Sequence, residues 1–205
     1  MAKPKARTIQ QRFGFMDDDL KSASHDDIMI WLDCAIDDML AQLVGYDDVW
    51  GLNEFEFIYQ DNNYPKWGSR EKPFPDKQKV FNSLFLPDKP PLVVTHKVWE
   101  QPISTETQRA GQSKYVVGFA DMLITYKPAQ LIYDLDSEEL TIFNSYYEKR
   151  VFFEVKSFIP SLGELIRQIR MYQQYVSGEW FVVSPDNKFK NQLKTQGIGF
   201  VHCVM

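Results

Sequence analysis

Phe152-Phe153-Glu154-Val155-Lys156-Ser157 is the stretch that decides the fold. It places a carboxylate and an ammonium group two residues apart in a run that otherwise has the pattern of a buried strand. Side chains alternate between the two faces of a strand, so Glu154 and Lys156 are expected to point to the same side. Charged side chains are rarely buried unless they are paired or bind a metal ion. The pattern therefore predicts a functional site on a strand of the core.

Three helices are expected along the chain. Apolar residues at helical spacing predict one over residues 24–43. Ser161 and Glu164 form a capping-box pattern and predict a helix that ends at Gly178. A third is expected over residues 187–196, because Gly197 follows it directly.

Strands account for most of the remaining apolar sequence. They are expected over residues 54–59, 92–99, 115–126, 150–157, 179–184 and 198–204, with a hairpin in 129–148 that turns at 134–137. Residues 60–79 and 101–113 are polar and are expected to form long loops. The order of elements indicates an α/β fold, with a central mixed β-sheet flanked by helices.

Length and composition fit a single domain over residues 1–205. The 205 residues are 44% hydrophobic and 25% charged, as in an ordinary globular protein. Cys34 and Cys203 are expected to be buried free thiols of a reducing compartment. No apolar run is long enough to cross a bilayer, and residues 1–12 do not resemble a signal peptide. The chain is therefore expected to be cytoplasmic, without a membrane partner.

Charge is unevenly distributed along the chain. The net charge is −5, yet residues 1–12 carry Lys3, Lys5, Arg7 and Arg12 and no acidic residue. Residues 1–14 are expected to form a flexible basic arm. An acidic scaffold with basic ends can still bind a polyanion locally, although ordinary surface charge explains the same pattern.

Two further features accompany the Glu154–Lys156 pair. Asp121 interrupts the apolar strand predicted at 115–126, so a second strand also buries an acid. In the helix after Ser161, Gln168 and Tyr172 are four residues apart and share a face. Acidic and polar groups from three elements are thus expected to meet beside one sheet.

Asp121, Glu154-Val155-Lys156 and the Gln-x-x-x-Tyr element at 168–172 together resemble the PD-(D/E)xK nuclease superfamily. The Gln-x-x-x-Tyr element is similar to that of its RecB-like and lambda-exonuclease-like branches. One departure is Ala120, which stands where the superfamily often has proline before the acid. The resemblance implies a restriction-endonuclease-like core and a metal-dependent nuclease, acting as an endonuclease or exonuclease on DNA.

The chemistry of phosphodiester hydrolysis gives these residues roles. Carboxylate oxygens of Asp121 and Glu154, with the Val155 carbonyl, suit Mg²⁺ or Mn²⁺. Lys156 is expected to orient or deprotonate the attacking water, because burial and nearby cations lower the pKa of a lysine. Gln168 is expected to hold Lys156 or a phosphate, and Tyr172 to contact the substrate backbone. An ion pair that braces the sheet is the alternative, although such pairs seldom repay desolvation.

The resemblance implies two further metal ligands. In the RecB-like branch a histidine of the early helix often binds the metal, and His25 occupies the matching place. Glu100 is a candidate for the further acid that some members use. A histidine packed under the sheet and a solvated glutamate at a strand end are the alternative interpretations.

Nucleic-acid contacts are predicted in two places. Arg167 and Arg170 lie off the apolar stripe of their helix and can reach phosphates. Lys66, Trp67 and Arg70 alternate basic and aromatic character in the loop 60–79, as surfaces that stack on single strands do. A solvated helix face and an ordinary loop anchored by Trp67 explain these residues equally well.

Other functions share the same expected fold. A catalytically silent module could bind nucleic acid or a protein, and a related nuclease could cut RNA or branched DNA. Any sequence specificity would come from a partner protein, from a homodimer, or from the loops at 60–79 and 101–113.

Overall fold

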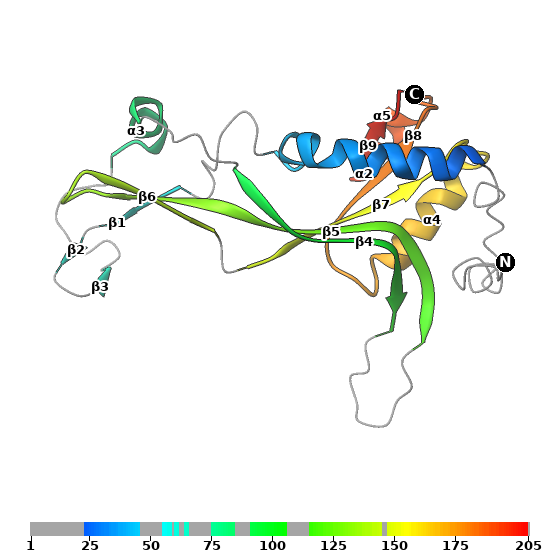
Figure 1. Ribbon diagram of the computed structural model, residues 1–205, viewed down its shortest axis with the longest axis horizontal. Coiled ribbons are helices and arrows are strands. Elements are labelled where there is room, and N and C mark those ends of the chain that lie inside the picture. Colours follow the sequence, from blue (N-terminus) through cyan, green and yellow to red (C-terminus); the bar gives the residue numbers. More distant parts are fainter. Residues whose placement is uncertain are drawn as a thin grey trace. The chain divides into compact units, whose positions relative to one another are not determined.

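The computed structural model describes residues 23–45, 55–58, 60–61, 64–65, 75–84, 91–105, 115–144 and 147–204 (Figure 1). The predicted basic arm at 1–14 lies outside them. The described residues fall into two compact units. The first is drawn from Met1–Asp38, His96–Thr125 and Arg150–Met205, and the second from Met39–Thr95 and Tyr126–Lys149. Each is described by itself below.

The protein has an α/β fold with a mixed central sheet of seven strands flanked by helices, as the sequence predicts. The strand order is β1-β5-β7-β8-β9, and β4 and β6 also pair with β5. The strands of this sheet are β1 (Phe55–Ile58), β4 (Leu92–Ser104), β5 (Val116–Asp134), β6 (Glu139–Asn144), β7 (Lys149–Val155), β8 (Glu179–Ser184) and β9 (Gly199–His202). β7 and β8 are parallel, with Glu154 opposite Val182, and β8 and β9 are also parallel.

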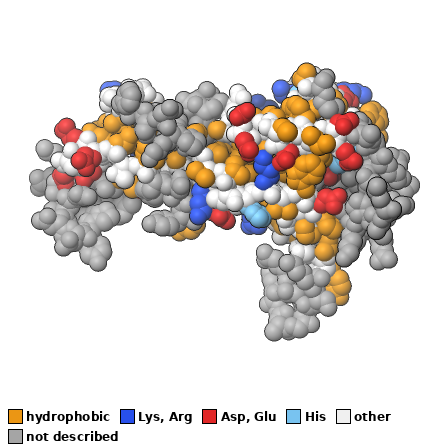
Figure 2. Space-filling view, in the orientation of Figure 1, with side chains coloured by type: hydrophobic (Ala, Val, Ile, Leu, Met, Phe, Trp, Pro, Cys, Tyr) orange, Lys and Arg blue, Asp and Glu red, His pale blue; other side chains and the backbone are white. Residues whose placement is uncertain are grey.

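The helix predicted at 24–43 is present as α2 (Ala23–Leu43). Ile28, Leu32 and Ile36 are fully buried at intervals of four residues, which is the spacing of one helix face. On the outer part of α2, Asp33 and Asp37 pair with Lys97 of β4 at 3.3 and 3.2 Å. Figure 2 shows acidic and basic side chains together among the apolar ones over α2. The ion pairs therefore fix one face of α2 to the strand that carries Lys97.

The helix after Ser161 is α4 (Leu162–Tyr172), and its start agrees with the capping prediction. The hydroxyl of Ser161 accepts a hydrogen bond from the Glu164 amide. The predicted end at Gly178 is wrong, because the helix ends at Tyr172 and a tight turn follows in which the Tyr175 amide donates to the Tyr172 carbonyl at 2.9 Å. Gly178 has a different role: a Cβ there would lie 2.7 Å from the Arg150 carbonyl. The absence of a side chain at position 178 therefore lets the main chain at this residue pass close to β7.

The strand predictions are correct in place, but the two at 92–99 and 115–126 are too short. β4 continues to Ser104, so the loop predicted from residue 101 begins too early, and Ile103 is fully buried. The strand expected at 115–126 and the first arm of the predicted hairpin are one strand, β5. Proline at position 128 does not interrupt it, and the adjacent Ala129 amide donates to the Pro91 carbonyl at 2.8 Å.

The second unit contains the predicted hairpin. β5 and β6 pair antiparallel, with Leu131 opposite Ile142, and the chain turns between them at residues 135–138. β1 lies parallel to the same end of β5, with Phe57 opposite Tyr133. Leu131 and Phe57 are buried together with Phe81.

Residues 60–79 are not one continuous loop, which corrects the prediction. They include the short strands β2 (Gln60–Asp61) and β3 (Tyr64–Pro65), and the first turn of α3 (Lys77–Ser83). Asp76 caps α3 by accepting a hydrogen bond from the Gln78 amide at 2.9 Å. Phe81 is the buried residue of this helix, and the partly buried Val80 and Leu84 pack against the same apolar cluster.

The last elements agree with the sequence within a few residues. α5 (Lys190–Thr195) is shorter than the helix predicted at 187–196, and Gly197 follows it with a φ of +68°. Both cysteines are free, but Cys34 is exposed and only Cys203 is buried, which corrects the prediction for Cys34. No helix in the described ranges is both long and apolar enough to cross a membrane.

Candidate functional site

The two acids singled out in the sequence lie on neighbouring strands of the first unit. Asp121 of β5 is 6% exposed and Glu154 of β7 is 1% exposed. The Asp121 carboxylate accepts a hydrogen bond from the Val155 amide at 2.7 Å. This hydrogen bond therefore holds the Asp121 carboxylate against the main chain of Val155, the residue that directly follows Glu154.

Glu154 and Lys156 form a buried ion pair. Lys156 Nζ lies 3.0 Å from Glu154 Oε1, and the lysine side chain is 6% exposed. The two side chains thus share one face of β7, and Phe153 on the other face stacks on Phe181. An opposite charge at this distance offsets part of the cost of removing each group from water.

α4 supplies two polar side chains to the same place. Gln168 Nε2 donates to Glu154 Oε1 at 2.8 Å and lies 3.2 Å from the Tyr172 hydroxyl. Gln168 therefore holds Glu154, a partner the sequence did not predict for it. Tyr172 is fully buried, with its hydroxyl beside Gln168, and its contact with a substrate backbone stays a prediction.

Gly118 of β5 belongs to this group of residues, although the sequence analysis did not select it. A Cβ at position 118 would lie 2.6 Å from Tyr172 Cζ and closer still to the Tyr172 hydroxyl. An isolated glycine within an apolar strand is the sequence signal that could have revealed this close approach.

The first turn of α2 brings His25 to Asp121. His25 is 6% exposed, and its Nε2 lies 3.6 Å from Asp121 Oδ1. Burial alone would lower the pKa of His25, but the Asp121 carboxylate and, less strongly, Asp26 outweigh it and raise the pKa above its ordinary value. The charge of Lys156 acts in the opposite direction on the same pKa. His25, Asp121 and Lys156 therefore share one electrostatic environment.

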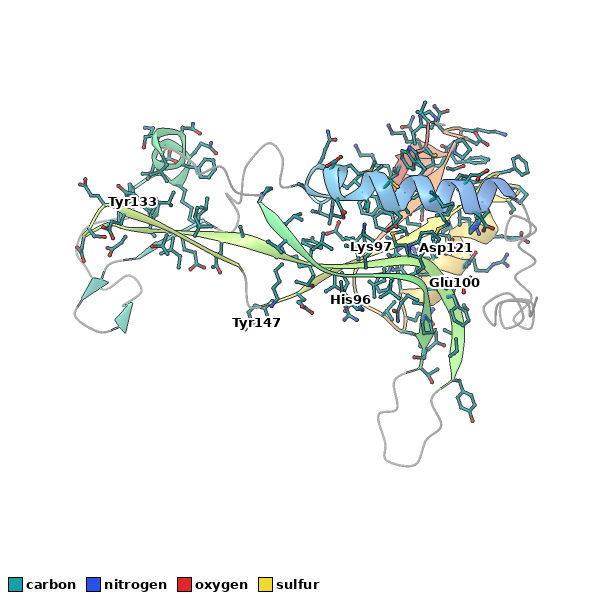
Figure 3. All side chains as sticks on the ribbon, viewed as in Figure 1. His96, Lys97, Glu100, Asp121, Tyr133 and Tyr147 are labelled. Carbon is teal, nitrogen blue, oxygen red and sulfur yellow. The ribbon has the colours of Figure 1, made fainter. Side chains whose placement is uncertain are left out.

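Glu100 of β4 is exposed and has a φ of +50°, a backbone conformation uncommon for residues other than glycine (Figure 3). Within the described ranges it forms no hydrogen bond or ion pair with Asp121, Glu154 or Lys156. Its proposed part in metal binding stays a prediction from the resemblance.

The two arginines of α4 differ in their contacts. Arg167 is exposed and lies 3.8 Å from Glu164 of the preceding turn, a weak surface pair. Arg170 donates to the Gln173 side chain and to the Gln196 carbonyl, and so ties α4 to the end of α5. Arg167 is thus the better placed of the two for a phosphate contact. Lys66, Trp67 and Arg70 lie outside the described residues.

The donor set of the site suits a hard divalent cation. Asp121 and Glu154 offer carboxylate oxygens, which Mg²⁺ and Mn²⁺ prefer, and His25 offers an imidazole nitrogen, which suits a transition metal better than Mg²⁺. Among the described residues, no three His, Cys, Asp or Glu side chains already stand close enough together to hold an ion. Metal binding would therefore require the side chains of Asp121, Glu154 and His25 to move closer together.

Comparisons of the chain with protein-family models, curated proteins and solved structures find no significant match.

Proposed function

We propose that the chain is a metal-dependent nuclease of the PD-(D/E)xK type, with a restriction-endonuclease-like core, that hydrolyses phosphodiester bonds in DNA. The observation that carries the proposal is the buried pairing of Glu154 and Lys156 at 3.0 Å on a core strand. Beside it, Asp121 is fixed to the Val155 amide at 2.7 Å. Two acids and a lysine with less than a tenth of their surface exposed are a costly arrangement for a purely structural role.

The chain's own residues fit hydrolysis of a phosphate ester. Asp121 and Glu154 would hold Mg²⁺ or Mn²⁺, with His25 as a further ligand next to Asp121. The bound ion would supply charge neutralisation of the phosphate and a lowered pKa of water. Lys156 Nζ would orient the attacking water and place a positive charge beside the phosphate oxygens. Gln168 would keep the Glu154 carboxylate in one orientation.

DNA is proposed as the substrate because the sequence resembles DNA nucleases. Arg167, which is exposed on α4, would contact a phosphate of the DNA. Specificity would come from a homodimer, a partner protein or the segments 60–79 and 101–113. A cytoplasmic setting is part of the proposal, because free cysteines fit a reducing compartment.

Cleavage of a substrate panel tests the proposal directly. Purified protein would be incubated with Mg²⁺ or Mn²⁺ and with linear, circular, single-stranded and branched DNA and with RNA. We expect cleavage of DNA that chelation of the metal abolishes. Lys156→Met should abolish cleavage, whereas Lys97→Met should preserve it, because Lys97 is also a paired and partly buried lysine but contacts Asp33 and Asp37.

A binding measurement separates loss of chemistry from loss of the metal. Isothermal titration with Mn²⁺ should show one site in the wild type and none in Asp121→Asn. Full DNA cleavage by Lys156→Met would refute the catalytic assignment.

A catalytically silent module is the second candidate, and one observation favours it. Glu154 Oε1 already accepts hydrogen bonds from both Lys156 and Gln168, so one oxygen of this acid is paired within the protein. On this alternative the site braces the sheet and the chain binds nucleic acid or a protein. Failure to cleave any nucleic acid, together with absent Mn²⁺ binding, would support it. Cleavage of RNA or branched DNA alone would keep the chemistry and change the substrate.

A further inference from the structure

Gly118 lies on β5, three residues before Asp121, with its α-carbon facing the end of the Tyr172 side chain. A methyl group at position 118 would lie 2.6 Å from Tyr172 Cζ, with the hydroxyl oxygen and Cε1 closer still. Carbon atoms in contact normally stay about 3.5–4.0 Å apart. The hydrogen atom of glycine is therefore what allows the Tyr172 ring to occupy its present place.

The Tyr172 ring has little room to move away. It is fully buried, and its centre lies 5.6 Å from the ring of Trp180, which in turn stacks on Phe152 at 4.8 Å. Protein cores are packed as densely as organic crystals, so a displaced ring transmits its shift to its neighbours. A side chain added at position 118 would move the tyrosine hydroxyl.

The Tyr172 hydroxyl begins a short series of hydrogen bonds that ends at the ion pair. It lies 3.2 Å from Gln168 Nε2, which lies 2.8 Å from Glu154 Oε1. The same oxygen lies 3.0 Å from Lys156 Nζ. A shift of the hydroxyl is thus passed to the side chain that orients the Glu154 carboxylate.

We propose that Gly118 is a positioning residue, which sets the orientation of Glu154 through Tyr172 and Gln168. The structural part of this inference stands on the geometry alone. Its catalytic consequence rests on the proposed nuclease function. Misplacing a catalytic group by about 1 Å can reduce a rate by about 100-fold, so Gly118→Ala should lower kcat by about 10- to 100-fold with a smaller change in KM.

Gly199 provides a matched control for the added methyl group. A Cβ at position 199 of β9 would lie 2.9 Å from Phe181 Cγ and nearer to two other ring atoms. Gly199→Ala therefore creates a similar clash with a buried aromatic ring of a neighbouring strand, but the Phe181 ring stacks on Phe153 and is not part of the hydrogen bonds that join Tyr172, Gln168 and Glu154. Both variants should lose stability, and only Gly118→Ala should disturb the site.

The structural test uses the side-chain amide resonances of Gln168 in nuclear magnetic resonance spectra. We expect them to shift in Gly118→Ala and in Tyr172→Phe, and to stay in place in Gly199→Ala. Unchanged Gln168 resonances in both Gly118→Ala and Tyr172→Phe would overturn the proposal. This readout does not depend on whether the protein cleaves nucleic acid.

A second variant guards against failure of Gly118→Ala to fold. Tyr172→Leu removes the ring atoms that the new methyl group would meet. Gly118→Ala should therefore lower the midpoint of thermal unfolding much less in the Tyr172→Leu background than in the wild type. An equal loss in both backgrounds, or failure of the double variant to fold where Tyr172→Leu folds, would overturn the steric part of the inference.

The activity arm separates this inference from the proposed function. If the wild type cleaves DNA, kcat should be lower in Gly118→Ala than in the wild type and unchanged in Gly199→Ala. Both variants would be measured at a temperature where they are folded. Shifted Gln168 resonances with an unchanged kcat would overturn the catalytic consequence. Shifted resonances in a protein whose wild type cleaves nothing would support the positioning role and refute the nuclease.

Discussion

Gln168 Nε2 donates a hydrogen bond of 2.8 Å to Glu154 Oε1, and so joins the middle of α4 to the carboxyl end of β7. Both side chains are almost fully buried. The amide therefore gives the carboxylate a fixed donor in a place that water scarcely reaches. This single contact explains why a polar residue sits in the buried stripe of an amphipathic helix.

Removal of the Gln168 amide should weaken the site without unfolding the protein. Gln168→Leu keeps much of the volume and deletes the donor, so we expect metal affinity or cleavage to fall about 10- to 100-fold. Isothermal titration and DNA cleavage measure the two effects. Gln173→Leu, just beyond α4, is the control, because Gln173 contacts Arg170 and not Glu154. Equal losses in the two variants would contradict the positioning role.

The Glu154–Lys156 pair should show strong coupling in stability. Lys156→Met leaves a buried carboxylate without its cation, and we expect a loss of about 3–5 kcal/mol in the free energy of unfolding. Glu154→Gln in the same chain should recover part of that loss, because the buried charge is then removed. Urea denaturation of the two single variants and the double variant gives the coupling. Additive losses would show that the two groups do not depend on each other.

Asp121 should stabilise the sheet through one hydrogen bond as well as serving the site. Asp121→Ala leaves the Val155 amide without its 2.7 Å acceptor, with an expected loss of about 1–3 kcal/mol. Asp121→Asn retains an oxygen that can accept the same hydrogen bond, so it should lose less. The difference between the two variants in urea denaturation checks this. If Asn and Ala behave alike, the charge and not the hydrogen bond is the stabilising feature.

Lys97 should make a pH-dependent contribution to stability. Burial would lower the pKa of Lys97, but Asp37 and Asp33 outweigh it and raise the pKa above the ordinary 10.5. A raised pKa means that the stabilisation is complete below about pH 10.5 and is lost as the pH rises through the higher pKa of the folded state. Lys97→Met should therefore lower the free energy of unfolding by about 0.5–1 kcal/mol at pH 7. The gap between wild type and variant should narrow above pH 10.5 in urea denaturation, and a gap that widens there would contradict the assignment.

Much of the fold and the placement of the site residues follow from local patterns. Alternation along β7 puts Glu154 and Lys156 on one side, and a spacing of four places Gln168 and Tyr172 on one face of α4. These relationships depend on the geometry of one strand or one helix. The roles of the residues as ligands and catalysts remain predictions.

The features that the sequence did not predict depend on distant neighbours. α3 is short and mostly polar, and its packing depends on Phe81 meeting Phe57 and Leu131 from other elements. The donation from Gln168 to Glu154 and the fit of Tyr172 on Gly118 require β5, β7 and α4 to be assembled first. No pattern within one element records such distances.

β7 has a strand on each side, β5 and β8, and this limits how the site can be regulated. The Val155 and Lys156 amides donate to the Asp121 carboxylate and to the Val183 carbonyl. Buried amides that are hydrogen-bonded exchange their hydrogen with solvent slowly, because exchange requires a local or larger opening. We therefore expect the Val155 and Lys156 amides to exchange slowly, so that local melting would not be the means by which the proposed nuclease is switched off.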